Sequence, residues 1–209
     1  MAIDKKMSTL IALVTYLFSG CLQAQYISET DFIALKTGDT LTGKVAYINE
    51  DGWGSRTFYK KIRITLANGK KKKIRKRNIT SFKIDGTTFM AFELAQHRKS
   101  TALLPFLNPY YSIDTKDGDL YFLRVVSNGK LNYYELEWFD QGDDMLNSMP
   151  LLRKNDASVF VRATQGMLGL KRKALISYLN DCPKLGQKIT SKEIRTVREV
   201  VNFYNNQCD

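Results

Sequence analysis

Residues 120–139 of the chain read LYFLRVVSNGKLNYYELEWF. Runs rich in β-branched and aromatic residues flank Asn128-Gly129, and this dipeptide between two such runs is a strong signal for a β-hairpin. With a two-residue loop, one face of the hairpin carries Tyr121, Leu123, Val125, Tyr134, Leu136 and Trp138. We therefore predict two antiparallel strands whose shared apolar face belongs to the core.

A second hairpin is predicted closer to the N-terminus. Ile62, Ile64 and Leu66 alternate with polar residues, which is typical of a half-buried strand, and Asn68-Gly69 follows. A strict two-residue loop there would place lysines opposite Ile64 and Leu66. We therefore predict a longer loop or a bulge that shifts the register by one residue.

Further strands are expected over residues 26–35, 40–48, 79–84 and 89–94, with turns at 36–39 and 85–86. Gly43 indicates a bend or a close approach of two backbones. The stretch from Thr101 to Tyr111 contains two prolines and is predicted to be a loop that covers the core. An exposed aromatic patch with Tyr110 and Tyr111 is the alternative.

From Leu170 onward the apolar period changes from two to about 3.6 residues, which predicts helices. Pro183 lies just past the expected end of the first helix, and Thr190 with Glu193 is predicted to form the capping box of the last. The predicted fold is α+β, a mostly antiparallel β-sheet or small open barrel with two to three C-terminal helices. We expect one domain, with residues 25–165 forming the β-rich region and residues 166–209 a helical region packed on the sheet.

The N-terminus has the residue order of a secretory signal peptide. Lys5 and Lys6 precede an apolar run over residues 10–18, and small and polar residues follow it. We predict cleavage after Ala24 and export to the periplasm or beyond the cell. Residues 18–21 also resemble a bacterial lipobox, which would place a lipid on Cys21 and make the protein a membrane-tethered lipoprotein. No stretch reaches the ~20 apolar residues that a transmembrane helix needs.

Two cysteines remain after such a cleavage, Cys182 and Cys208. An even pair in an oxidising compartment predicts a disulfide, although two free thiols are the alternative. The loop-entropy model gives this bridge about 3.5 kcal/mol of stabilisation. The spacing does not match a redox or zinc motif, and we expect no metal and no cofactor.

The charge of the chain is concentrated in one segment. The formal net charge is +11, and residues 60–77 hold ten basic residues and no acidic residue. Such a segment attracts an anionic envelope polymer or an acidic envelope protein, whereas export argues against nucleic acid. The alternative is a lysine-rich strand edge that prevents aggregation. The candidate binding residues are Lys61, Arg63, Lys70, Lys71, Lys72, Lys73, Arg75, Lys76 and Arg77, with Trp53 in the preceding loop.

The residues that commonly carry catalysis are sparse. His97 is the only histidine and lies in a basic stretch, where we expect a surface position. Asp114, Asp117 and Asp119 lack the spacing of a calcium loop. Glu135 and Glu137 share one face of a strand, which we predict to be exposed, and they are the candidates for a carboxylate-dependent hydrolase. We expect a protein that is not an enzyme.

Three segments, residues 38–45, 79–84 and 173–204, resemble a diffuse group of uncharacterised, exported β-rich proteins of Gram-negative bacteria. The resemblance implies a small β-rich module with a helical tail, and it implies no activity. The sequence therefore favours a cell-envelope or periplasmic binding or structural protein. The alternative is an exported hydrolase of envelope polymers.

Overall fold

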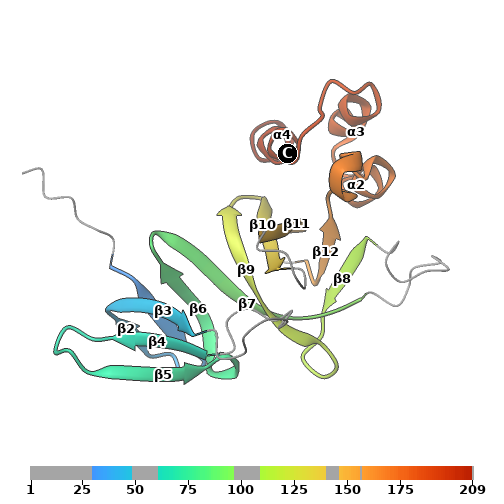
Figure 1. The fold of residues 1–209 in the computed structure, drawn as a ribbon. Coiled ribbons are helices and arrows are strands. Elements are labelled where there is room, and N and C mark those ends of the chain that lie inside the picture. Colours follow the sequence, from blue (N-terminus) through green and yellow to red (C-terminus); the bar gives the residue numbers. More distant parts are fainter. Residues whose placement is uncertain (1–29, 49–60, 97–108, 140–145, 156, 209) are drawn as a thin grey trace, which may run out of the picture. The chain divides into compact units, whose positions relative to one another are not determined.

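The computed structural model describes residues 30–48, 61–96, 109–139, 146–155 and 157–208 (Figure 1). The predicted signal segment, Cys21, Trp53 and His97 lie outside these residues. The described chain is mostly antiparallel β-structure with three α-helices near the C-terminus, so the predicted α+β class is confirmed. Within the described residues, none of the helices has the length and apolar character that crossing a membrane requires.

Six strands close into a barrel, whereas the sequence predicted a sheet or a small open barrel. Their order is β7-β8-β12-β11-β10-β9, and β9 pairs again with β7. Every pairing is antiparallel. The strands are β7 (Thr87–Gln96), β8 (Tyr110–Ile113), β9 (Asp119–Ser127), β10 (Leu131–Phe139), β11 (Leu146–Lys154) and β12 (Val159–Arg162).

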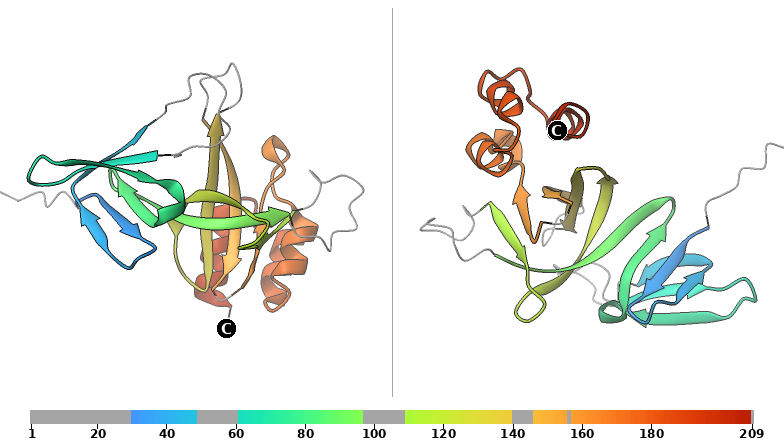
Figure 2. Two further views of the ribbon diagram at one scale, coloured as in Figure 1. Left: turned by 90° about the horizontal axis from the view of Figure 1, so that it is seen from below. Right: turned by 180° about the vertical axis from the view of Figure 1, so that it is seen from behind.

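The long strand β7 connects the barrel to the rest of the β-structure. Along one edge it pairs first with β6 (Ile79–Ile84) and then with β8, while β9 occupies its other edge (Figure 2). Beyond β6 the sheet continues through β1 (Phe32–Leu35) to β2 (Thr40–Thr42). A separate three-stranded sheet contains β3 (Lys44–Ile48), β4 (Lys61–Thr65) and β5 (Lys71–Arg75).

The buried apolar side chains form three clusters. One fills the barrel and includes Phe92, Tyr134 and Phe160, whose rings meet edge to face. The second includes Ile62 of β4 and Phe82 of β6, so the small sheet packs on the β1-β6-β7 part of the large one. The third lies between the outside of the barrel and the helices.

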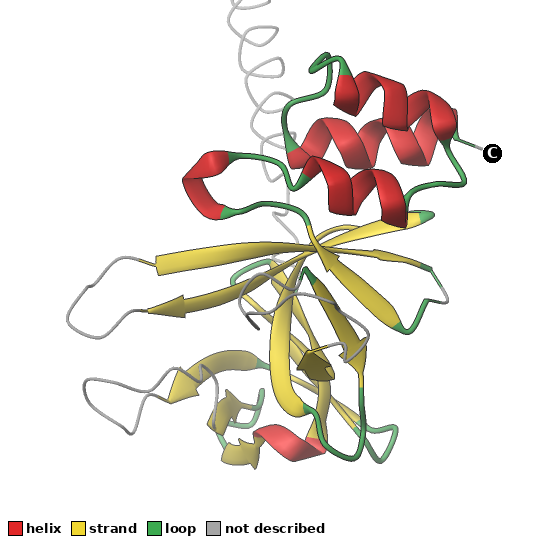
Figure 3. Ribbon diagram, turned by 90° about the vertical axis from the view of Figure 1, so that its right-hand side faces the viewer, coloured by secondary structure: helices red, strands yellow, loops and turns green. Residues whose placement is uncertain are grey.

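The helices cover the outer face of the β10-β11-β12 region (Figure 3). They are α2 (Arg172–Tyr178), α3 (Pro183–Thr190) and α4 (Val197–Gln207). Strand alternation explains the arrangement, because Leu151 and Phe160 point into the barrel while their neighbours Leu152 and Val161 point out to the helices.

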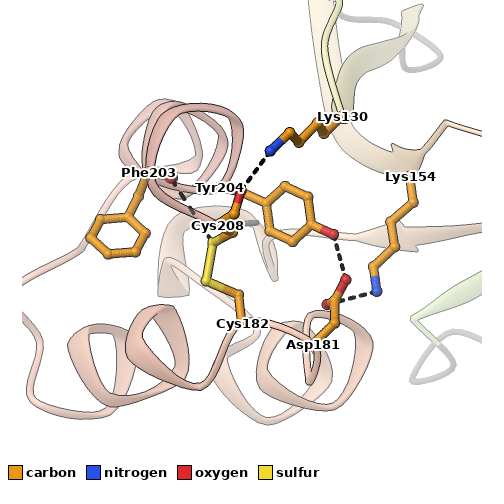
Figure 4. Close-up of a disulfide and its surroundings, with 7 residues drawn as sticks. All are labelled: Lys130, Lys154, Asp181, Cys182, Phe203, Tyr204 and Cys208. Atoms are coloured by element: carbon orange, nitrogen blue, oxygen red, sulfur yellow. Dashed lines mark hydrogen bonds and ion pairs between the residues drawn. A yellow bond between two sulfur atoms is a disulfide. The ribbon is translucent and has the colours of Figure 1, made fainter.

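The predicted disulfide is present, and it joins the start of α3 to the end of α4 (Figure 4). Beside it, Asp181 accepts hydrogen bonds from Tyr204 Oη (2.6 Å) and from Lys154 Nζ (2.8 Å). Lys130 Nζ donates to the Cys208 carbonyl at 2.7 Å. The bridge and these polar contacts tie the helices to one another and to the barrel.

The predicted capping box is in the wrong place. The box is formed by Thr196 and Glu199, where each side chain accepts from the other residue's backbone N–H at 3.3 and 2.8 Å. Pro183 does not merely follow a helix, because it opens α3, where a missing N–H costs nothing. As α3 runs through Thr190, this threonine lies at a helix end instead of a helix start.

The hairpin of β4 and β5 has the predicted shift of register. Leu66 N donates to the Lys70 carbonyl, so the loop has three residues and ends at Gly69, which has φ +76°. Ile74 consequently faces Ile62. The close approach predicted at Gly43 is also present, since a Cβ there would lie 2.2 Å from the Thr65 carbonyl oxygen.

The hairpin of β9 and β10 has the predicted faces but not the predicted two-residue loop. Val125 lies opposite Tyr134, and the face that they share fills the barrel. The ladder begins only at Ser127 and Tyr133 and leaves Val126 as an extra residue. The physical reason is competition, because the backbone N–H and carbonyl of Leu131 bond to the Asn205 side chain of α4.

The region predicted as a covering loop becomes a strand at its end. Tyr110 and Tyr111 begin β8, and both are half-buried. Tyr110 Oη donates to the Ala174 carbonyl at 3.3 Å. Residues 101–108 lie outside the described part of the chain.

Candidate functional site

The basic segment forms the hairpin of β4 and β5, residues 61–75, which we call the cationic hairpin. Ile62 and Ile64 are fully buried in the core between the two sheets. Because side chains alternate along a strand, the intervening residues of β4 lie on the opposite, outer face. Together with their cross-strand partners and the first residue of β3, this face carries Lys44, Lys61, Arg63, Lys71, Lys73 and Arg75.

The register places cations directly opposite one another. Lys61 faces Arg75, and Arg63 faces Lys73. These are non-hydrogen-bonded pairs, since the bond between Leu66 N and the Lys70 carbonyl fixes the alternation along the ladder. Side chains approach most closely in pairs of this type, and like charges at such positions are destabilising. The outer face is therefore a site of concentrated positive charge.

A groove of about 720 Å³ lies along β5. Leu35 and Ile74 supply its apolar lining, and both also pack at the border of the core between the sheets. Its cationic lining residues are Lys36, Lys72, Lys73, Arg75 and Arg77.

The groove joins segments that are distant in sequence. Lys36 N donates to the Asn78 carbonyl at 2.9 Å, which fixes the turn after β1 against the 3₁₀ helix η1 (Lys76–Asn78). Lys36 Nζ lies 3.2 Å from Glu93 Oε1 of β7. These contacts hold the turn as the second wall of the groove, across from β5.

The predicted binding residues are therefore divided among different surfaces. Lys61, Arg63 and Lys71 lie on the outer face, Lys72 and Arg77 line the groove, and Lys70 is exposed in the turn. Lys73 and Arg75 lie on the outer face and also line the groove. Lys76 is directed elsewhere, because its Nζ donates to the Leu120 carbonyl at 3.3 Å. Trp53 lies outside the described residues.

Sequence reasoning missed Lys36 and Lys44. The position of Lys44 follows from alternation, since it precedes the buried Val45 in β3. No local signal predicts Lys36, because its place in the groove depends on the contact with Asn78.

The two candidate catalytic glutamates were predicted to be exposed, and this prediction is wrong. The side chains of Glu135 and Glu137 are 12% and 10% exposed. Arg124 of β9 forms an ion pair with both, and its Nε lies 2.6 Å from Glu137 Oε1. Tyr133 Oη donates to Glu135 at 2.5 Å. The pair is thus part of a cluster in which one arginine bridges two carboxylates on the strand surface.

This cluster changes the titration of its members. Burial raises the pKa of the Glu137 carboxyl, and the nearby Arg124 only partly opposes this shift. Burial together with the hydrogen bond to Glu135 raises the pKa of the Tyr133 hydroxyl far above its usual range. Neither glutamate lines the groove along β5.

A second cavity, of about 580 Å³, lies beside the disulfide between α2 and α3, and its lining residues carry no charge. Among the described residues, no group of three or more histidine, cysteine or acidic side chains could hold a metal ion. Asp114 instead accepts backbone hydrogen bonds from Lys116 and Asp117, each at 3.0 Å, and so forms a polar turn.

The geometry offers an open, cationic surface next to a groove with an apolar floor. Comparisons of the chain with protein-family models, with curated proteins and with solved structures found no match.

Proposed function

We propose that this protein is an exported, non-enzymatic binding protein of the cell envelope that holds an anionic partner on its cationic hairpin. The observation that carries this proposal is the pairing of Lys61 with Arg75 and of Arg63 with Lys73 at closely spaced positions of the ladder. Like charges directly opposite one another in a sheet are destabilising. An anion bound beside them would lower this repulsion.

A role in preventing aggregation explains only some of the positive charges on the cationic hairpin. Lysines on an edge strand discourage pairing with other chains, and this accounts for the charges of β5. It does not account for Lys61 and Arg63, because β4 is the central strand of its sheet. Among the described residues, no ion pair involves Arg63 or Arg75.

The Cys182–Cys208 disulfide supports the proposed export, since such bridges persist mainly in oxidising compartments. Export and retention in the envelope remain part of the proposal, and so does the choice between a released protein and a lipoprotein anchored at Cys21.

The proposal is tested by the salt dependence of binding. Purified protein is titrated with dextran sulfate and with lipopolysaccharide over a range of salt concentrations. In the triple variant Arg63→Gln, Lys73→Gln, Arg75→Gln we expect the slope of log affinity against log salt to become shallower by roughly one per charge removed.

The matched control is Lys116→Gln, Lys173→Gln, Lys184→Gln, which removes the same net charge from exposed positions elsewhere. We expect this control to bind nearly as well as the unmodified protein. Equal losses of affinity in both triple variants would mean that binding depends on net charge alone and not on the cationic hairpin. The proposal would be overturned if the unmodified protein bound neither polymer.

A second candidate function is a carboxylate-dependent hydrolase of envelope polymers. The raised pKa of Glu137 favours it, because a general acid must stay protonated near the working pH. The ion pairs of both glutamates with Arg124 weigh against it, since one guanidinium already binds both carboxylates without a substrate. Hydrolysis of envelope polysaccharide that disappears in Glu137→Gln would favour the hydrolase.

A further inference from the structure

Among the described residues, β5 pairs only with β4, so it is an edge strand of the three-stranded sheet. Backbone groups of an antiparallel strand point alternately toward the partner and away from it. Because the Lys70 carbonyl bonds to β4, the alternation directs the N–H and carbonyl groups of Lys71 and Arg75 away from β4. This edge of β5 borders the groove.

The groove combines the three features that an added strand needs. The edge supplies backbone donors and acceptors at the repeat of a strand. Ile74 and Leu35 supply an apolar inner surface, which an apolar side chain of the added strand would cover. Lys73 and Arg75, which flank Ile74 in β5, supply positive charge at the two adjacent positions.

We propose that an extended, acidic polypeptide binds to the edge of β5 as an additional strand. This rests on the proposed function and names the anionic partner, because only a polypeptide backbone matches the donors and acceptors of a sheet edge. Its side chains alternate between two faces. The recognised sequence is therefore acidic, apolar, acidic, with the apolar residue opposite Ile74 and the acidic residues opposite Lys73 and Arg75.

The decisive comparison is Arg75→Pro with Arg75→Gln. Both variants lose the same charge, and only proline also removes the N–H that points away from β4. Residue 75 has φ −74°, which a proline ring accepts, and proline is tolerated where the N–H faces away from the sheet. Thermal unfolding of the two variants verifies that both are folded.

The probe is a short fluorescent peptide of alternating glutamate and valine, followed by anisotropy. We expect Arg75→Pro to bind it at least roughly fivefold more weakly than Arg75→Gln, from the loss of one hydrogen bond. Dextran sulfate, which has no peptide backbone, is expected to bind both variants equally.

The same peptide methylated on its backbone nitrogens tests the unmodified protein, and we expect its binding to be lost. Equal binding of the first peptide by both Arg75 variants, or unchanged binding of the methylated peptide, would overturn strand addition. If dextran sulfate still bound in a salt-dependent manner, the proposed function would survive that result. Failure of the unmodified protein to bind either probe would overturn both.

Discussion

Arg63 illustrates how a strand and its register fix the direction of a single cation and the residue that it faces. Its neighbours in β4 are buried isoleucines, so the strand fixes its direction, and the register fixes Lys73 opposite it. Two cations at a non-hydrogen-bonded pair repel each other across the shortest spacing in the sheet.

We predict that Arg63→Thr stabilises the protein by roughly 0.2–1 kcal/mol, because threonine favours strands and the repulsion with Lys73 disappears. Urea unfolding at low salt measures the gain. Lys44→Thr is the control, since Lys44 lies opposite Thr65 and not opposite a charge. A gain in the control that equals the gain in Arg63→Thr would contradict the argument.

Asp181 is a second residue whose charge has a defined structural use. Burial opposes ionisation, but the hydrogen bonds from Lys154 and Tyr204 outweigh it and lower the pKa of the Asp181 carboxyl. A lowered pKa in the folded state stabilises the fold above the unfolded value near 3.8, and this contribution is lost as the pH falls through the folded value.

Tyr204→Phe is therefore expected to cost about 1 kcal/mol at neutral pH, a figure reduced for the partial exposure of Asp181. The difference from the unmodified protein shrinks as the pH falls below about 3.8. Denaturant unfolding at a series of pH values measures it. A difference that stays constant down to the lowest pH would show that the tyrosine acts through packing alone.

At the scale of elements, the start of α4 is set by the two reciprocal hydrogen bonds between Thr196 and Glu199. The earlier Thr190, which has a similar local sequence, does not start this helix. Thr190 and Thr196 are each followed three residues later by glutamate, so the sequence offers two capping boxes. Pro183 decides between them, because it starts α3 and makes Thr190 the last residue of that helix.

Thr196→Ala is expected to cost about 1 kcal/mol, since it removes the cap of α4. Thr190→Ala is the matched control, because the Thr190 hydroxyl only donates to the Gly186 carbonyl within α3. Urea unfolding of both variants gives the two costs. A larger cost for Thr190→Ala would place the start of the last helix at the earlier threonine.

For the whole molecule, local patterns predict the elements, and contacts between distant residues determine how they combine. Alternation at Ile62 and Ile64 predicts β4 and the direction of its cations. Closure of the barrel depends on the pairing of β7 with β9, for example of Phe89 with Arg124, and no local pattern contains it.

In the candidate site, too, local patterns predict some features and contacts between distant residues determine the others. The cations of β4 and β5 follow from the sequence, whereas the groove requires Lys36 to bond to Asn78. The pairing of Glu135 with Arg124 was not predictable, because a two-residue loop would place Arg124 opposite Tyr133 and the observed pairing requires the shift that leaves Val126 unpaired. That shift depends on Asn205 of α4.

The disulfide and the cationic hairpin belong to different parts of the core. Both cysteines are buried in the cluster beneath the helices, whereas the isoleucines of β4 belong to the cluster between the two sheets. Loss of the bridge therefore weakens the helical region first.

We predict that the double variant Cys182→Ser, Cys208→Ser loses about 3.5 kcal/mol of stability, as the closed loop spans a sequence separation of 26 residues. Hydrogen exchange is expected to accelerate in α2, α3 and α4 and to change little in β4, while dextran sulfate still binds. Equal acceleration in β4 and α4 would mean that the three clusters unfold as one unit, and the binding surface would then depend on the bridge.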